Sequence, residues 1–346
     1  MSAPPDPWTL PSAAAFLDEI EAAAEGGLVL VEEDPTAPAG LSDALIQRFR
    51  QRDWVVERLC PEEAAPPAAC LAAAFGTAHT IEGLQSSALI DHVILVDLSG
   101  LVTSALHSWR VFSERFYDAC QQRQTIGLAI ILVGVRDTGS IGGSLPNVAW
   151  DQRLRRSDVT IWADLHAPLD RSEPVSLLAA ALAVELCGWR LDLAEALARA
   201  STADLLDPLA WLLRRDTPPV AGMYRFAGRD MACPLQLAAD ERQEELDRRL
   251  WRAQVAALFP WLEDLRQRAI ARHRKKLAVD DHLRALGVRD VDEIELGALS
   301  WQLAQKITRD EHQAIVCLAR IRNRLAHRAP ALPDDIDRAL SATRSW

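Results

Sequence analysis

Short runs of apolar and β-branched residues, separated by longer amphipathic stretches, occupy much of the first half of the chain. The runs that we predict as strands cover 28–31, 54–59, 93–97, 128–135 and 159–162. The run at 128–135 is too short to span a bilayer and is rich in valine and isoleucine, which is typical of a buried strand. Apolar strands that alternate with helices form a parallel sheet covered on both faces. We therefore predict an α/β fold, with the strands ending at Val31, Asp97 and Val135 side by side.

The order of strand, loop, helix and strand over residues 28–59 resembles the opening of a P-loop nucleotide-binding domain. Asp97 ends an apolar strand, as a carboxylate does at a Walker B position. The resemblance is to the additional-strand ATPases, which include signalling NTPases of bacterial defence. It implies a P-loop-like core over residues 1–170, followed by a helical lid and linker over 171–235.

The loop after the first strand lacks the chemistry of a working phosphate site. Such a loop reads G-x-x-x-x-G-K-[ST], because backbone N–H groups cradle the phosphates and the lysine reaches them. Gly40 and Ser42 are present, but Leu41 stands where the lysine belongs, and no lysine precedes Lys275. The acidic run 32–34 would also repel a polyphosphate. We expect a degenerate site that does not hydrolyse ATP or GTP and binds neither more tightly than about 1 mM.

The strand-end carboxylate has also lost its catalytic neighbour. Leu98 follows Asp97, so the second carboxylate that would activate water is missing. Asp97 is therefore either what is left of a nucleotide site or a strand-end carboxylate that caps a neighbouring turn.

Leucine- and alanine-rich stretches replace β-branched clusters from about residue 174 onward, which favours helices. The predicted helices cover 175–187, 191–200, 204–215, 237–277 with an interruption near Pro260, and 334–343, and a loop is predicted at 216–235. Leu296, Leu299, Trp301 and Leu303 are predicted to be core residues of a further helix. Residues 236–346 are thus expected to form an all-α domain.

The stretch 315–330 carries the most specific pattern in this helical part. Plotted at 100° per residue, one face collects the apolar residues Ile315, Leu318, Ala319, Leu325 and Ala326. Arg322 falls in the middle of that face, and Asn323 and His327 lie four residues apart on its flank. Pro330 is expected to end the helix. An arginine on an apolar face requires an anionic or hydrogen-bonding partner, because burying an unpaired charge is costly.

The Arg322-Asn323-x-x-x-His327 arrangement resembles the signature of the HEPN superfamily of small helical domains, in which an Arg and a polar residue precede a His by a few positions. Many HEPN domains are metal-independent ribonucleases that act as dimers, and the resemblance implies an HEPN-like bundle over residues 236–346. His327 would then transfer protons, Arg322 would hold the scissile phosphate, and Asn323 would orient the histidine or contact the phosphate. Products with 2′,3′-cyclic phosphates and a site shared by two copies are implied as well.

Two alternatives stay open for this motif. Arg322 can instead pair with a carboxylate of a neighbouring helix, while Asn323 and His327 close a contact between helices. Some HEPN domains cleave nothing and act in RNA binding or assembly, and the protein would then be an RNA-binding component or a non-enzymatic scaffold that forms homodimers through this domain. In either case the setting expected by analogy is a bacterial defence or stress system, with a protein partner docked on the P-loop-like domain.

A run of cations precedes the motif. The residues expected to contact RNA phosphates are Arg272, Arg274, Lys275, Lys276 and Arg324. The alternative is that the first four complement the dipole at the C-terminus of a helix.

Composition restricts the remaining functions. The formal net charge of -11 means that RNA must be bound by a local patch rather than by the whole surface. Six scattered cysteines without C-x-x-C spacing indicate reduced, mostly buried thiols. We expect no metal site and no cofactor, because the histidines and cysteines lack ligand spacing. No signal peptide or run of about 18 apolar residues is present, so we expect a cytoplasmic protein that does not enter membranes.

Overall fold

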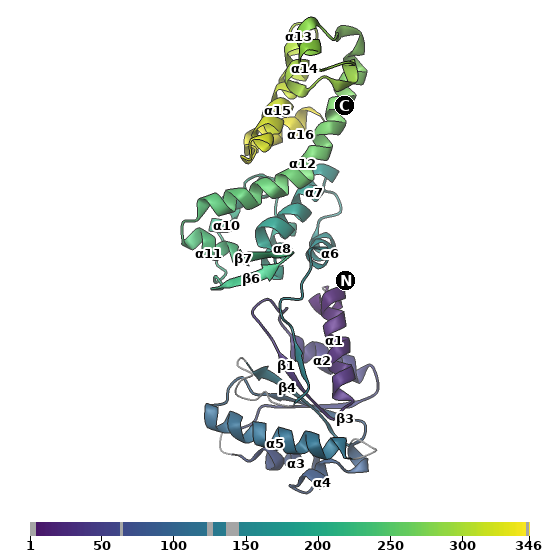
Figure 1. The fold of residues 1–346 in the computed structure, drawn as a ribbon, viewed down its shortest axis with the longest axis vertical. Coiled ribbons are helices and arrows are strands. Elements are labelled where there is room, and N and C mark those ends of the chain that lie inside the picture. The colour runs from purple at the N-terminus through teal and green to yellow at the C-terminus, as the bar shows by residue number, and fades with distance from the viewer. Residues whose placement is uncertain (1–4, 63–64, 123–126, 136–144, 344–345) are drawn as a thin grey trace. The chain divides into compact units, whose positions relative to one another are not determined.

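The computed structural model describes residues 5–62, 65–122, 127–135, 145–343 and 346. It divides into two compact units, Met1–Asp158 and Val159–Trp346 (Figure 1). The predicted domain limits at 171 and 236 both fall inside the second unit. Among the described residues, no helix combines the length and the apolar character that crossing a membrane requires.

The first unit is built on a parallel sheet of five strands. These are β1 (Leu28–Glu32), β2 (Val55–Leu59), β3 (His92–Asp97), β4 (Ala129–Val135) and β5 (Asn147–Ala149), in the order β2-β3-β4-β1-β5. Leu30 of β1 pairs with Leu132 of β4, and Leu95 of β3 pairs with Ile131. The three strands predicted to lie side by side therefore do so, with β4 in the middle, and β3 is not an edge strand.

Helices cover both faces of this sheet (Figure 1). They are α1 (Pro11–Ala24), α2 (Leu41–Arg50), α3 (Pro67–Phe75), α4 (Ile81–Leu84) and α5 (Thr103–Gln121). Leu30, Ile94 and Leu132 share one core with Leu71 of α3 and Phe116 of α5. Because side chains alternate along a strand, the residues between them are buried on the opposite face, where α1 and α2 lie. This two-sided burial is the reason why β1, β3 and β4 contain so few polar residues.

The prediction of a strand at 159–162 is wrong, because these residues lie in α6 (Arg156–His166). Val159, Trp162, Ala163 and His166 are buried, and their spacing of three and four residues is helical. The fifth strand is the three-residue β5, which pairs with β1. A run of four residues with three apolar side chains does not distinguish one turn of a helix from a short strand.

The second unit is mainly helical. After α6 it contains α7 (Glu173–Leu182), a π-helical turn (Ala183–Cys187), α8 (Leu191–Ala198), α9 (Thr202–Leu206), α10 (Pro208–Leu213), β6 (Met223–Phe226), β7 (Arg229–Ala232) and α11 (Pro234–Ala239). The predicted loop at 216–235 contains an antiparallel hairpin, β6–β7. Its two-residue turn places both Ala227 and Gly228 at positive φ, as the tightest hairpin connections require.

A 31-residue helix, α12 (Gln243–His273), packs against α7, the π-helical turn and α15. It is followed by α13 (Asp281–Ala285), α14 (Leu296–Leu303), α15 (Arg309–Ala326) and α16 (Pro333–Ala342). The predicted interruption at Pro260 is wrong, since α12 continues through it. Ala257, Leu258 and Leu262 are buried around the proline, so packing against neighbouring helices offsets the lost backbone hydrogen bond.

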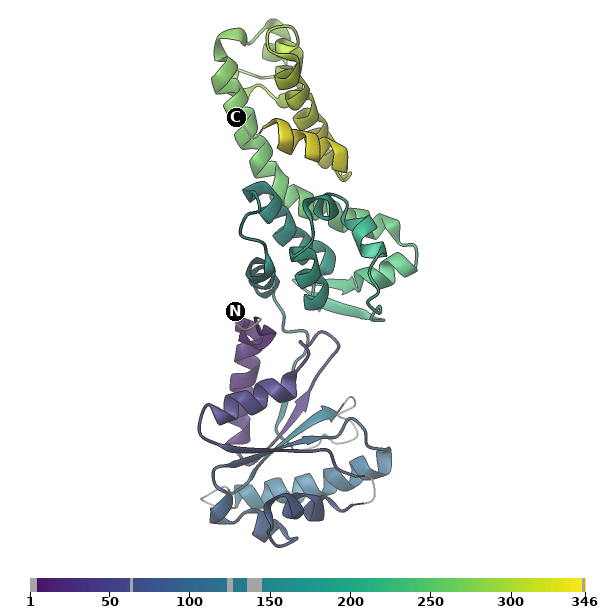
Figure 2. The ribbon, with the colours of Figure 1, turned by 180° about the vertical axis from the view of Figure 1, so that it is seen from behind.

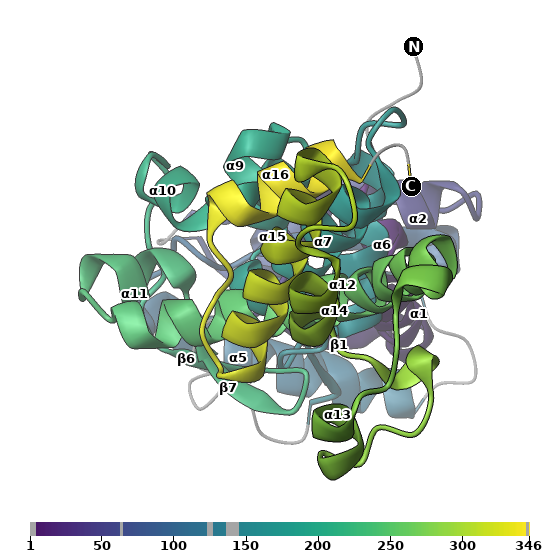
Figure 3. The same ribbon diagram turned by 90° about the horizontal axis from the view of Figure 1, so that it is seen from above.

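α15 runs antiparallel to α12, as the views from behind and from above show (Figures 2 and 3). The indole N–H of Trp251 donates to the Leu325 carbonyl at 2.7 Å, near the end of α15. At its other end, Glu311 lies 3.9 Å from the imidazole of His273. Each end of α15 is therefore fixed to a different part of α12.

Candidate functional site

The Arg322–His327 motif occupies the last turn and the cap of α15. The helix ends at Ala326, His327 is the capping residue, and Arg328 takes the left-handed conformation at φ 60°. The N–H of Ala329 donates to the Arg324 carbonyl at 2.9 Å, and that of Arg328 donates to Leu325 at 3.2 Å. This hydrogen-bond pattern ends the helix before Pro330 is reached.

The buried stripe of α15 does not centre on Arg322. Ala314, Leu318, Ile321 and Leu325 are buried, whereas Ala326 is exposed. The prediction that Arg322 lies in the middle of the apolar face is therefore wrong, and Ile321 takes that place. Successive residues of a helix point in directions 100° apart. With Ile321 at the centre of the buried stripe, Arg322 therefore lies at its edge.

Arg322 pairs with Glu295, the residue just before α14. Its Nη2 atom lies 3.2 Å from the Glu295 Oε2 atom, with the two side chains 39% and 62% exposed. An ion pair this open to solvent contributes about 1 kcal/mol or less. The sequence had left open a carboxylate partner for Arg322, but nothing in the helical pattern identified Glu295.

The other two motif residues, Asn323 and His327, are exposed. Their spacing of four places them on one side of the helix, as expected. Arg322 and His327 are five residues apart, which corresponds to directions that differ by about 140° around the axis. One chain therefore presents the guanidinium and the imidazole on different sides of the helix end.

The backbone around the motif is held firmly. In addition to the Trp251 bond, the N–H of Ala331 donates to the side-chain oxygen of Gln254 on α12 at 2.7 Å. The guanidinium of Arg324 donates to the Pro330 carbonyl at 2.6 Å. The motif side chains thus extend from a rigid helix end, and Arg324 is part of what makes it rigid.

The other cations predicted to bind RNA lie at the opposite end of α15. Arg272 pairs with Glu311 at 3.0 Å, and Arg274 pairs with Asp290 and Asp292. The ammonium of Lys276 donates to the Lys306 carbonyl at 2.7 Å, and the ammonium of Lys306 donates to the Lys276 carbonyl at 2.9 Å. Lys275 is exposed. Glu311 and Arg324 are thirteen residues apart, on the order of 20 Å along a helix. The structure therefore does not bring this run together with the motif.

The loop predicted to be a degenerate nucleotide site is closed by one of its own acids. Asp34 accepts hydrogen bonds from the N–H groups of Thr36 at 2.7 Å and of Gln152 at 2.8 Å. The indole N–H of Trp150 donates to the Thr36 hydroxyl, and that of Trp8 donates to the Ala39 carbonyl, both at 2.9 Å. One carboxylate thus ties the loop to the segment that follows β5.

The residues after this loop begin α2. Gly40 caps the helix at φ 88°, which favours glycine, and Ser42 is half-buried in the first turn. Leu41, at the position of the missing lysine, is 3% exposed and belongs to the core. A lysine there would have to bury its charge.

Asp97 caps the turn that follows β3. Its Oδ1 atom accepts the Ser99 N–H at 3.1 Å and the Ser99 hydroxyl at 2.7 Å, and Arg58 lies 3.4 Å from Oδ2. Partial burial alone would raise the pKa of Asp97, but the bonds from Ser99 and Arg58 lower it below its ordinary value. Desolvation and then the charge of Asp97 raise the pKa of Glu33. The turn-capping alternative accounts for Asp97.

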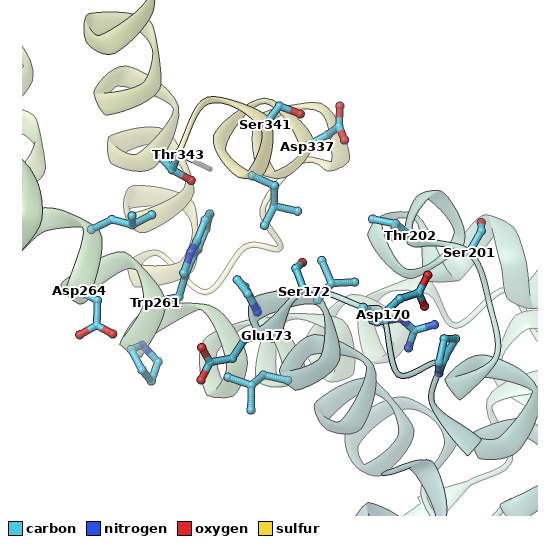
Figure 4. Close-up of a pocket in the computed structure, with 18 of the residues that line it drawn as sticks. Asp170, Ser172, Glu173, Ser201, Thr202, Trp261, Asp264, Asp337, Ser341 and Thr343 are labelled. Atoms are coloured by element: carbon cyan, nitrogen blue, oxygen red, sulfur yellow. The ribbon is translucent and has the colours of Figure 1, made fainter. Parts of the chain in front are cut away.

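A pocket of about 940 Å³ lies elsewhere in the second unit, between the start of α7, the middle of α12 and α16 (Figure 4). Trp261 and Pro260 form part of its wall, and Asp170, Glu173, Asp264 and Asp337 mix with Arg171, Arg199 and Arg268 around it. No predicted site residue lines it. The described part of the chain also contains no group of three His, Cys, Asp or Glu side chains that could hold a metal ion.

Four of the six cysteines are buried, one is half-buried and Cys60 is exposed.

Comparison of the chain with protein families, with curated proteins and with solved structures finds no match.

Proposed function

We propose that the end of α15 is one half of an HEPN-like RNA-cleavage site, completed by a second copy of the chain. One observation carries the proposal: Arg322 and His327 are accessible on a firmly held helix end, yet extend from different sides of it. A single copy cannot easily place both groups on one phosphate. A two-fold arrangement of two copies can pair the arginine of one with the histidine of the other.

In this site the reaction needs no metal. His327 removes the proton of a ribose 2′-OH, the oxygen attacks the adjacent phosphorus, and the 5′-oxygen leaves as a hydroxyl after taking a proton from a histidine. Arg322 stabilises the charge that develops on the phosphate, and Asn323 orients the reacting groups. The products are a 2′,3′-cyclic phosphate and a 5′-hydroxyl.

Arg322 must leave Glu295 before it can bind a phosphate. The exchange is feasible because the existing pair is exposed and weak, whereas a guanidinium holds a phosphate through two parallel hydrogen bonds. Free protein and RNA-bound protein therefore differ in the partner of Arg322.

For the first unit we propose a P-loop-like fold that has lost nucleotide chemistry and serves to dock a protein partner. The position of β4 between β1 and β3 supports the additional-strand resemblance. The closed acidic loop and the buried Leu41 support the loss of the nucleotide. The proposed setting is bacterial defence or stress, in the cytoplasm.

The second candidate is a non-enzymatic scaffold that dimerises through the helical part. It is favoured by the basic residues, because Arg272, Arg274, Lys276 and Arg324 already have partners within the protein. Each of these cations would have to leave its present partner before it could bind an RNA phosphate.

The test is incubation of the purified full chain with single-stranded and structured RNA, in the presence of EDTA. We expect cleavage fragments whose 3′ ends resist phosphatase until the cyclic phosphate is opened by acid. A chain that is dimeric on a sizing column but leaves every RNA intact supports the scaffold and contradicts the nuclease.

A further inference from the structure

The tip of the second unit contains an open, apolar cup of about 900 Å³ between α13 and α14. Its wall is formed by Leu283, Leu286, Val288, Ala298 and Trp301. Trp301 is 72% exposed and Leu286 is 68% exposed, although the sequence predicts Trp301 as a core residue. Leu296, Leu299 and Leu303 are buried on one side of α14, so Trp301 lies on the opposite, exposed side. Exposed tryptophan and leucine that share a concave surface are characteristic of binding sites.

The rim of the cup is acidic. Its ionisable side chains are mainly carboxylates, those of Asp280, Glu293 and Glu295. Among the described residues, His282 lines the cup but no lysine or arginine does. Two of these carboxylates hold backbone N–H groups rather than cations, Asp280 that of Leu283 at 2.9 Å and Glu293 that of Arg289 at 2.6 Å. The rim therefore keeps negative charge that a cation from outside can meet.

This combination selects among occupants. RNA is disfavoured, because its phosphates would face the carboxylates. A second copy joined cup to cup is disfavoured too, because a two-fold contact would bring the two acidic rims together. An aliphatic or aromatic side chain fits the wall, and an adjacent lysine or arginine fits the rim.

We infer that the cup binds a peptide segment of another protein in which a large apolar side chain lies within a few residues of a lysine or arginine. The apolar side chain packs between Leu286 and Trp301, and the cation meets Glu293 or Asp280. This docking does not depend on the proposed RNA cleavage, so either can be present without the other.

The experiment is selection of a displayed library of random peptides on the full chain. The targets are wild type, Trp301→Ser, Leu286→Ser and, as a matched control, Leu213→Ser, whose side chain is 72% exposed outside the cup. We expect wild type and Leu213→Ser to enrich peptides with an apolar anchor beside Arg or Lys. The affinity of the enriched peptides should fall about tenfold or more on Trp301→Ser and Leu286→Ser.

Two further measurements complete the test. Glu293→Gln should weaken the same peptides, and added salt should weaken them on wild type more than on this variant. Circular dichroism should give all four variants the melting curve of wild type. The inference is overturned if no peptide is enriched, if acidic peptides are enriched, or if the cup variants bind as wild type does. Wild-type dimers that dissociate in Trp301→Ser would overturn it in favour of self-association.

Discussion

The loop of the first unit and the helix end of the second unit both carry residues that sequence patterns associate with phosphate chemistry, but the two regions use them differently. In the first unit, Asp34 accepts the backbone N–H groups of Thr36 and Gln152, and Asp97 caps the turn after β3. At the end of α15 the hydrogen bonds of the backbone are satisfied, while Asn323 and His327 extend into solvent. The comparison teaches that exposure, rather than residue type, separates a polar group used for folding from one that is free to act.

The largest expected effect is on RNA cleavage. His327→Ala and Arg322→Ala should each lower the rate by about 10²- to 10⁴-fold, because each removes a group that acts in the transition state. The matched controls are His107→Ala and Arg320→Ala. His107 is an exposed histidine on α5, and Arg320 lies on α15, as Arg322 does, and pairs with Asp335 of α16 at 3.6 Å. If a control loses as much activity as its motif counterpart, the contrast between the two regions fails.

Mixing the two inactive variants sharpens this test. In a mixed dimer one composite site carries both substitutions and the other carries neither. Random reassociation should thus restore about a quarter of the wild-type activity. No recovery after exchange of subunits would contradict a site shared between copies.

Substitutions at the closed loop of the first unit should lower the stability of the protein rather than its activity. Trp150 is fully buried, contacts Trp8 and Phe16, and donates to Thr36. Trp150→Ala should therefore lower the free energy of unfolding by about 3–5 kcal/mol, as measured by urea denaturation. Trp54→Ala, at a half-buried tryptophan of the same unit, should cost clearly less. Equal losses would mean that the loop is not an important part of the core.

Nucleotide binding gives a direct test of closure. Calorimetric titration of wild type with Mg-ATP or Mg-GTP should detect no binding tighter than about 1 mM, weaker than roughly -4 kcal/mol. The closed loop and the acidic run leave no receptive surface for a polyphosphate. A micromolar dissociation constant would show that the loop opens and that the two regions are less different than proposed.

The smallest expected effect is the pH dependence of stability at the far end of α15. Burial lowers the pKa of His273, with nearby Arg272 and Lys276 acting in the same direction and Glu311 against it. A depressed pKa means that the folded state binds the proton less readily than the unfolded state. This contribution to stability is therefore complete above the ordinary histidine pKa of about 6.5 and is lost as the pH falls through the lower folded value.

Melting curves between neutral pH and about pH 5 should show this loss as a decrease of a few degrees or less. His273→Gln should reduce the pH dependence, while the exposed His107→Gln should leave it unchanged. A melting temperature that rises on acidification, and does so less in His273→Gln, would contradict the direction.

The sequence predicted the sheet well because β1, β3 and β4 are apolar on both faces, a pattern that few other structures produce. It failed at 159–162, where three apolar residues in a run of four fit a helix or a strand, and at Trp301, whose side chain is exposed on α14. For the motif it identified the helix and the alternative of an acidic partner. Glu295 could not be predicted as the partner of Arg322. The two residues are 27 positions apart, and the periodicity within a helix does not show which distant residues the tertiary structure brings together.

Glu295 also belongs to both the cup and the Arg322 pair. A cation held by Glu293 or Asp280 in the cup also attracts Glu295 and so weakens its pairing with Arg322, and a phosphate that binds Arg322 leaves the charge of Glu295 to attract that cation. Such mutual effects are equal in free energy, since linkage between two binding equilibria is reciprocal. One exposed carboxylate therefore lets occupancy of the cup and occupancy at the end of α15 strengthen each other.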